Sequence, residues 1–161
     1  MRLRAAVPAD AEAIARIWNG YIRETAVTFT DVEKTTEGIA ADIAARRGDG
    51  LFLVAGEGGA VSGFATAYPF RAGSGYRLTL EHTVHVAPNA RGRGAGRALM
   101  TGLEAAACAA GAHVLVAAVS GENAAAIGFH ARLGYAEVGR MPEAGQKFGR
   151  WLDLVLMQKF L

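Results

Sequence analysis

Residues Leu78 to Gly111 read LTLEHTVHVAPNARGRGAGRALMTGLEAAACAAG and carry the signals of three consecutive elements. Leu78 to Val86 alternates apolar and polar side chains, which is typical of a β-strand with one buried face. The next residues are rich in arginine and glycine, and the remainder has apolar residues at helical spacing. The stretch therefore predicts a strand, a basic glycine-rich loop and a long helix that ends at Gly111.

The loop between the predicted strand and helix has the composition of an anion-binding site. The first N–H groups of a helix have no partner inside it, and the aligned peptide dipoles place partial positive charge there. Glycine lets the backbone approach a ligand closely, and arginine adds fork-shaped donors that suit phosphate. No capping residue stands directly before Gly94, so we expect a pyrophosphate to bind here. The residues expected around it are Arg91, Gly92, Arg93, Gly94, Ala95, Gly96 and Arg97.

Two familiar glycine-rich motifs do not fit this loop. A dinucleotide-binding G-x-G-x-x-G would need glycine at Arg97 or Leu99, and a Walker-type loop would need a Gly-Lys pair, which the sequence lacks. The pattern that fits is R-x-x-G-x-G at Arg91, Gly94 and Gly96, directly after the predicted strand. This pattern resembles the coenzyme A motif of the GCN5-related N-acetyltransferases.

The composition limits the class of protein. A chain of 161 residues with 52% hydrophobic residues suits a single domain over residues 1–161. The net charge of +2 is small and the charges are interleaved outside the glycine-rich loop, which argues against a nucleic-acid partner. Cys108 is the single cysteine, so no intramolecular disulfide can form, and its alanine-rich surroundings predict a small core residue.

The N-terminal region carries no targeting signal. Asp10 and Glu12 interrupt it before an apolar run of signal-peptide length can form. No apolar run in the sequence approaches the ~20 residues that cross a bilayer. We therefore expect a cytoplasmic protein without a membrane partner.

The remaining periodicities predict alternating strands and helices. Helices are expected after a cap at Asp10, over Thr36 to Arg47, and from a cap at Asn123 to Leu133. The other expected strands are 2–6, 51–55, 61–68, 114–119, 135–139 and 151–157, with a hairpin turn at 58–59 and a pocket-lining loop at 25–30. This order predicts an α/β domain with helices on both faces of a mixed β-sheet.

The resemblance extends over nearly the whole chain, with a weaker match over Thr28 to Gly50. The run PFR…Y…E-x-T-V-x-V, the loop RGRGAG, the segment ENAAAIGFHARLG and the closing KFGRWLDLVLMQ are similar to the phosphinothricin and methionine sulfoximine N-acetyltransferases. The resemblance implies a GNAT-like fold, acetyl-CoA as co-substrate without a metal, an amino-acid-like acceptor and a homodimer.

Glu81 is expected to be the general base. An amine must lose its proton before it attacks a thioester, and a free α-amine with a pKa near ~8 is partly protonated at neutral pH. On an unbulged strand Glu81 shares the polar face with Thr83 and His85, shortly before the phosphate loop. The resemblance places the family's catalytic glutamate at this position. A solvated glutamate on an edge strand is the alternative.

The resemblance also implies contacts between the main chain and the cofactor. Main-chain groups of Val84, His85 and Val86 would hold the acetyl carbonyl and the pantetheine arm. A backbone N–H is a suitable donor for the negative charge that develops on the thioester oxygen. Asn123 would contact coenzyme A, and a plain helix cap is the alternative for this residue.

His130 is expected to belong to the site as well. It lies beside the apolar face of the predicted helix, where a hydrogen-bonded core histidine is the usual case. The resemblance implies that it either binds an acidic group of the acceptor or protonates the departing thiolate. His82 and His85 are expected on opposite faces of their strand, so they do not predict a zinc site.

Arg71, Tyr76 and Thr83 match the acceptor-binding positions of the family. A cation, a phenol and a hydroxyl together suit a carboxylate and a tetrahedral phosphinate or sulfoximine. Phosphinothricin enzymes often carry a further basic residue where this sequence has Gly73, and its absence favours a broader range of acceptors. A surface-loop arginine is the alternative for Arg71.

The sequence thus predicts direct acetyl transfer from acetyl-CoA to the α-amine of a small amino-acid-like compound, with Glu81 as the base. A peptide N-terminus or another small amine is the alternative acceptor. A non-catalytic acyl-CoA-binding sensor is the alternative from another functional class. Such a sensor would keep the glycine-rich loop and would have no need of Glu81.

Overall fold

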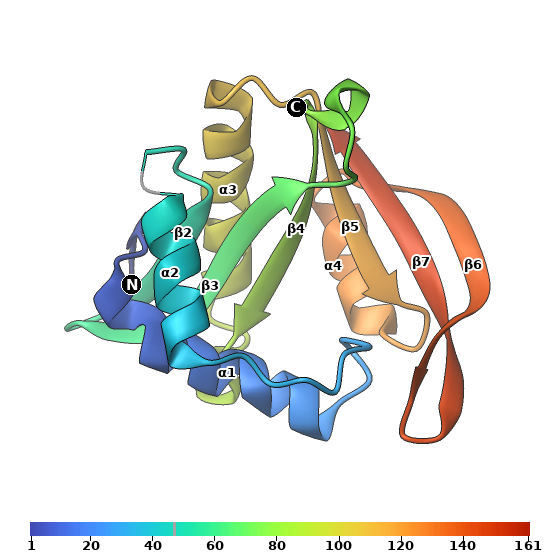
Figure 1. Cartoon of the computed structure of the whole chain (residues 1–161), viewed down its shortest axis with the longest axis horizontal. Helices are drawn as coiled ribbons and strands as arrows, with labels where there is room; N and C mark the ends of the chain where they lie inside the picture. Colours follow the sequence, from blue (N-terminus) through green and yellow to red (C-terminus); the bar gives the residue numbers. More distant parts are fainter. Residues whose placement is uncertain (47) are drawn as a thin grey trace.

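The computed structural model describes residues 1–46 and 48–161, which form a seven-stranded sheet flanked by helices (Figure 1). The strands are β1 (Arg2–Ala5), β2 (Phe52–Glu57), β3 (Ala60–Pro69), β4 (Thr79–Val86), β5 (Val114–Ser120), β6 (Ala136–Lys147) and β7 (Arg150–Phe160). The helices are α1 (Ala11–Glu24), α2 (Thr36–Ala45), α3 (Ala95–Ala109) and α4 (Ala124–Arg132). The predicted order of strands and helices is confirmed.

The sheet has the strand order β1-β2-β3-β4-β5-β7-β6. Neighbouring strands are antiparallel except β4 and β5, which are parallel and are connected through α3. Parallel neighbours need such a crossover because the chain must return to the start of the next strand. The sheet is therefore mixed, as the sequence predicted.

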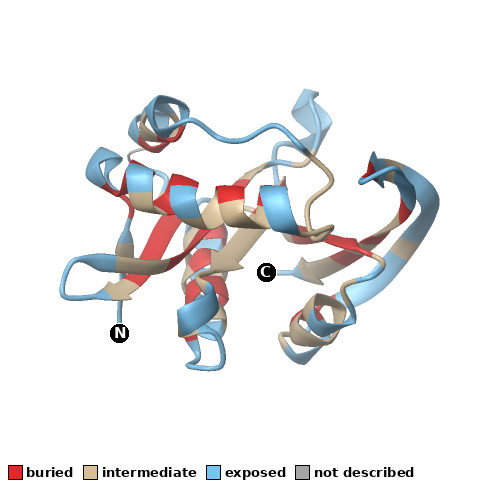
Figure 2. Ribbon diagram, turned by 90° about the horizontal axis from the view of Figure 1, so that it is seen from below, coloured by how far each residue is buried: buried red, intermediate tan, exposed pale blue. Residues whose placement is uncertain are grey.

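Helices cover both faces of the sheet. On one face, Ile14 of α1 and Ile43 of α2 are buried in a cluster with Phe64 of β3. On the other face, Leu103 of α3 is buried in a second cluster with Leu115 of β5, and α4 packs beside it. Figure 2 shows these two layers with their buried stripes turned toward the strands. The sheet between the two helix pairs buries the apolar face of each pair.

The two parallel strands separate partway along their length. β4 and β5 are paired only as far as His82 and Ala117. Beyond this point β4 remains paired with β3 as far as Val86, and β5 remains paired with β7 as far as Ser120. Figure 1 shows the two strands diverging toward the end of the molecule that carries α1. We call the gap between Thr83–Val86 and the end of β5 the fork.

Two expectations about single residues are wrong. Asp10 does not cap α1, because its carboxylate accepts hydrogen bonds from the Arg4 guanidinium at 2.7 Å and from the Val7 N–H at 2.9 Å. Cys108 is exposed on α3. Its neighbour Ala107 is fully buried, and one residue further along a helix turns the side chain by about 100° toward solvent.

The C-terminal hairpin is longer than predicted. The strands expected from the sequence were 135–139 and 151–157, with a connection between them that contains glycine and lysine. In the structure β6 continues to Lys147, with a shift of register between Met141 and Gly145 that accommodates Pro142. The turn itself lies at residues 148–149.

Most other predicted boundaries lie within two residues of those observed. The predicted helix from Thr36 to Arg47 appears as α2, capped by the Thr35 hydroxyl, which accepts a hydrogen bond from the Gly38 N–H. Arg47 lies outside the described residues. No helix in the described ranges is both long and apolar enough to cross a membrane.

The packing of α3 predicts a difference between two of its residues. Leu103 is fully buried against the sheet, so Leu103→Ala should lower the free energy of unfolding by about 2–5 kcal/mol. Cys108→Ala, on the exposed side of the same helix, should change it by less than about 0.5 kcal/mol. Urea unfolding followed by circular dichroism measures both values. Equal losses for the two variants would contradict the observed orientation of α3.

Candidate active site

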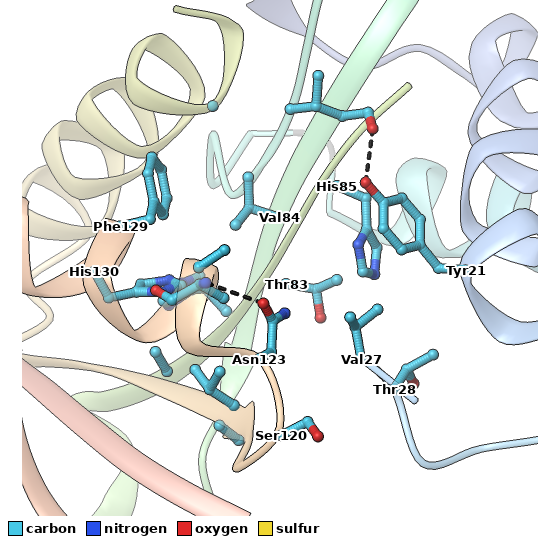
Figure 3. Close-up of a pocket in the computed structure, with 18 of the residues that line it drawn as sticks. Tyr21, Val27, Thr28, Thr83, Val84, His85, Ser120, Asn123, Phe129 and His130 are labelled. Carbon is cyan, nitrogen blue, oxygen red and sulfur yellow. Dashed lines mark hydrogen bonds between the residues drawn. The ribbon is translucent and has the colours of Figure 1, made fainter. Parts of the chain in front are cut away.

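A cavity of about 940 Å³ occupies the fork and continues to the start of α3. β4 lines it from Glu81 to Val86, and β5 lines it from Ala117 to Ser120. The other walls come from α1, the loop at 27–30, the glycine-rich loop and α4. Figure 3 shows side chains from these elements converging on one space. The site is therefore built by segments that lie far apart in the sequence.

The main chain of β4 presents groups that have no partner on β5 to this cavity. Alternate residues of a strand direct their N–H and C=O groups to opposite edges. The Ala87 N–H donates to the Ser62 carbonyl on the β3 side at 2.8 Å, so Val84 and Val86 direct their groups into the fork. There the Val86 carbonyl accepts a hydrogen bond from the Tyr21 hydroxyl at 2.8 Å. The Val84 N–H faces the cavity beyond the reach of β5.

The glycine-rich loop places the start of α3 at the cavity. Gly94 precedes the helix with φ of +81°, a conformation that favours glycine, and no side chain caps the helix. The first bond of this helix turn runs from the Ala98 N–H to the Gly94 carbonyl at 3.0 Å. The N–H groups of the three residues before Ala98 precede that bond, and these residues line the cavity. The uncapped helix start that the sequence predicted is therefore present, and its first N–H groups lie at the cavity.

The three arginines of the loop differ in position. The Arg91 guanidinium lines the cavity and donates to the Tyr21 hydroxyl at 2.9 Å, which links the loop to α1. Arg97 also lines the cavity, from the first turn of α3. Arg93 is exposed and is not among the lining residues. Arg91 and Arg97 are therefore the loop cations available to a bound anion.

Glu81 lies half-buried in the lining of the cavity, on the part of β4 next to the fork. Burial raises the pKa of the Glu81 carboxyl above its usual value, and hydrogen bonding with Tyr68 opposes that rise. Tyr68 is the residue paired with Glu81 across the β3–β4 hairpin, and its hydroxyl lies 3.4 Å from the Thr83 hydroxyl. Tyr68 was not predicted from the sequence, although the register of β3 against β4 places it opposite Glu81.

His130 forms a buried pair with His82, which sequence reasoning did not foresee. The His130 Nδ1 lies 2.8 Å from the Ala126 carbonyl and its Nε2 lies 3.0 Å from the His82 Nε2. A carbonyl only accepts, so Nδ1 of His130 carries a proton and the His82 Nε2–H donates to the neutral His130 ring. Burial lowers the pKa of His82 to about 3 and also lowers that of His130. Both rings are neutral at physiological pH.

His85 points to the opposite side of the strand, as predicted. Its ring stacks on Tyr21 with a centroid distance of 4.3 Å and packs against Trp18 of α1. Burial and the nearby Arg91 lower the pKa of His85 to about 4. Because Glu81 and Thr83 share this strand face with His85, their side chains also point toward the α1 layer. In residues 1–46 and 48–161, no group of three or more His, Cys, Asp and Glu side chains could hold a metal ion.

Asn123 lines the cavity and caps α4 at the same time (Figure 3). Its Oδ1 accepts a hydrogen bond from the Ala126 N–H at 3.0 Å. The cap uses only the oxygen, so the side-chain NH₂ keeps its donors for another partner. The capping alternative is therefore present and is compatible with a contact to a ligand.

The three predicted acceptor residues are not brought together. Thr83 lines the cavity, whereas Arg71 and Tyr76 are exposed in the connection between β3 and β4 and do not line it. Both contact Phe70: the Arg71 guanidinium lies 6.0 Å from its ring centroid, and the Tyr76 ring lies 6.4 Å away. Gly73 in the same connection has φ of +110°, so its backbone conformation is one that a basic residue would adopt only with strain.

Several cavity residues were not predicted from the sequence. Ser120 is 2% exposed, ends β5 and has a hydroxyl without a hydrogen-bond partner in the described part of the chain. Trp18, Tyr21 and Phe129 add aromatic surface from α1 and α4. None of these positions carries a local motif, because only the tertiary arrangement brings them to the fork. The loop at 27–30 lines the cavity, which confirms the expectation for it.

Comparison with known proteins identifies the family. The Acetyltransferase (GNAT) family matches residues 14–135, a range that includes the fork and the glycine-rich loop. The chain is 41% identical over 159 residues to the L-methionine sulfoximine/L-methionine sulfone acetyltransferase of Salmonella typhimurium, with 98% of this chain and 93% of that protein covered.

Solved structures agree with this assignment. A Salmonella typhimurium protein solved with its cofactor acetyl-CoA has a TM-score of 0.95 and 41% identity, over 100% of this chain and 94% of that one. A phosphinothricin acetyltransferase from Sinorhizobium meliloti in complex with acetyl-CoA has a TM-score of 0.92 and 34% identity, over 99% and 88% of the two chains. This chain therefore belongs to the GNAT family of acetyltransferases.

Proposed function

We propose that this enzyme transfers the acetyl group of acetyl-CoA directly to the α-amine of a small amino-acid-like acceptor. The observation that carries the proposal is the fork, in which the free Val84 N–H and the Glu81 carboxyl lie along one strand, next to the open N-terminus of α3. Acetyl-CoA, which is bound in the related structures, has a diphosphate for the helix end and a thioester for the strand.

Acetyl-CoA is proposed to lie along the α3 and α4 side of the fork. Its diphosphate would accept hydrogen bonds from the first N–H groups of α3, with Arg91 and Arg97 beside it. Its pantetheine arm would follow the main chain of Val84 to Val86, and Asn123 would contact it from α4. The Val84 N–H would stabilise the negative charge that develops on the thioester oxygen.

Glu81 is proposed to remove the proton from the acceptor's ammonium group, directly or through a water. The free amine then attacks the thioester carbon and a C–N bond forms. The C–S bond breaks, the nitrogen gives up its second proton, and coenzyme A leaves as a thiolate that takes up a proton. The raised pKa of Glu81 supports this role, because a base with a pKa closer to the working pH is more effective. The exposed position of Cys108 outside the cavity supports direct transfer without an acyl-enzyme.

For His130 we propose the role of proton source for the thiolate over that of a carboxylate anchor. It lines the cavity, but a neutral imidazole is a weak partner for a carboxylate. In this structure the His130 Nε2 accepts from His82 and carries no proton, so donation to the thiolate requires that this bond opens and that Nε2 first takes up a proton.

The acceptor class is proposed from the relatives and from the residues around Glu81. The similar proteins act on methionine sulfoximine, methionine sulfone and phosphinothricin. Thr83 lies in the cavity, and Arg71 and Tyr76 are proposed to hold the acceptor's acidic groups from the exposed β3–β4 connection. A peptide N-terminus remains the alternative acceptor, and a cytoplasmic location stays a prediction.

A homodimer is part of the proposal. Exposed apolar side chains gather on the C-terminal hairpin, where both faces of β6 are open to solvent over most of its length. The largest of these side chains are Val138, Met141, Phe148, Trp151 and Phe160. Clusters of exposed apolar residues of this kind are typical of protein–protein contacts. Sedimentation at micromolar concentration distinguishes a dimer from a monomer.

The function is tested by release of free thiol from acetyl-CoA. We expect the wild type to release thiol with methionine sulfone, methionine sulfoximine or phosphinothricin, and more slowly with short peptides. Glu81→Gln should lower kcat by about 10²–10⁴-fold while the Kd for acetyl-CoA is unchanged, since the base does not contact the diphosphate. A wild type that binds acetyl-CoA and releases no thiol with any acceptor would favour a sensor. Full activity of Glu81→Gln would remove Glu81 from the mechanism.

The pH profile tests the environment of Glu81. The carboxyl must be ionised to accept a proton, so kcat/KM should fall as the pH drops through its pKa. Hydrogen bonding with Tyr68 lowers this pKa, so Tyr68→Phe should raise it further and move the acid limb of the profile to higher pH. The alkaline limb should stay in place and serves as the internal control. An acid limb that stays fixed or moves to lower pH would contradict the assignment.

A further inference from the structure

Lys147, at the end of β6, is a buried cation that the proposed mechanism does not use. It is 5% exposed, and its Nζ donates hydrogen bonds to the main-chain carbonyls of Thr25 and Thr28, each at 2.7 Å. These carbonyls belong to the loop between α1 and α2 and lie 122 and 119 residues away along the chain. A side chain of the C-terminal hairpin is thus bonded to the N-terminal third of the protein.

These two bonds fix the backbone of the loop. Burying an ammonium group is costly unless its donors are paired, and two of its three donors are paired here with loop carbonyls. The Phe148 ring lies 5.1 Å from the same Nζ. Burial lowers the pKa of Lys147, and the nearby Asp31 opposes this. The lysine and the loop therefore depend on each other for their hydrogen bonds.

Gly145 provides a second contact between β6 and the same loop. A Cβ atom at Gly145 would lie 2.2 Å from the Phe29 ring, a separation that no real contact tolerates. Phe29 in turn lines the cavity. The absence of a side chain at Gly145 thus allows Phe29 to lie against the hairpin, two residues before Lys147 along β6.

The inner side of this loop faces the acceptor side of the fork. Residues 27–30 line the cavity, and Figure 3 shows Val27 and Thr28 pointing into the same space as Thr83. The loop follows α1, whose layer is the one toward which Glu81 and Thr83 point. The open end of α3 and Asn123 belong to the opposite layer. The proposed cofactor and this loop therefore approach the reacting atoms from different faces of the sheet.

We propose that Lys147 is a positioning residue for the acceptor: its two bonds to the Thr25 and Thr28 carbonyls hold residues 27–30 as the wall against which the acceptor side chain packs. This inference rests on the proposed function. The C-terminal hairpin would then contribute to acceptor selection, although among its described residues only Leu154 lines the cavity. Gly145 assists by leaving room for Phe29.

Kinetics with methionine sulfone as the varied acceptor test the proposal. Lys147→Met keeps the apolar stem of the side chain and removes its donors, and Gly145→Ala displaces Phe29 without changing any charge. Both variants should raise the KM for methionine sulfone about tenfold or more and leave the KM for acetyl-CoA within about twofold, because the loop lies on the acceptor face alone. Lys159→Met on β7 is the matched control, since Lys159 bonds Glu104 on the α3 side, and it should change neither constant.

Hydrogen–deuterium exchange supplies a readout that needs no turnover. In Lys147→Met the amides of residues 25–34 should exchange faster, while those of β4 and α3 keep their wild-type rates. If the wild type is active and Lys147→Met has the same KM values and the same amide exchange as the wild type, the positioning role of Lys147 is wrong, while the proposed function stands. Equal rises of both KM values, or faster exchange throughout the protein, would reduce Lys147 to a residue of general stability. A wild type that turns over no acceptor would overturn the proposed function and the positioning role with it.

Discussion

The separation of β4 from β5 is the constraint on which the site depends. Buried N–H and C=O groups need partners, and a strand that loses its neighbour must find others. At Val86 the Tyr21 hydroxyl supplies one, and Arg91 in turn bonds that hydroxyl, so α1 and the glycine-rich loop are held to the end of β4. At Val84, within the described part of the chain, the pairing with β5 has already ended and leaves the N–H open to the cavity. A ligand with an extended chain of amide and carbonyl groups can restore the missing pairing there.

The charged side chains that line the cavity are mostly cations, with a single carboxylate among the described residues. In the described ranges Glu81 is the single acidic side chain of the lining, against the cations Lys34, Arg91, Arg97 and Arg132. Such an excess of positive charge lowers the pKa of a carboxyl in general, yet burial dominates at Glu81 and raises it. The histidines remain neutral because burial outweighs their hydrogen bonds. This distribution agrees with the proposal that Arg91 and Arg97 bind the diphosphate of the cofactor and that Glu81 accepts the proton.

Local patterns predicted much of this protein, and long-range contacts account for what they missed. The order of elements, the uncapped start of α3 and the opposite directions of His82 and His85 follow from spacing within single segments. The fork, the His82–His130 pair and the Lys147 bonds join segments 35 or more residues apart, and no periodicity encodes them. Cys108 was misplaced because an alanine-rich helix gives little contrast between its faces. Arg71 and Tyr76 were taken from a family pattern, and in this structure they lie exposed in the β3–β4 connection, outside the cavity lining.

In the proposed complex, the free N–H of Val84 and the first amides of α3 receive the thioester and the diphosphate of one acetyl-CoA molecule. Amide ¹⁵N–¹H chemical shifts measured during a titration with acetyl-CoA test both contacts. We expect large shifts for Gly96 and Val84, and a smaller shift for Val84 when coenzyme A without its acetyl group is added. Saturable binding that leaves the amide shifts of Val84 and Gly96 unchanged would rule out this mode of binding.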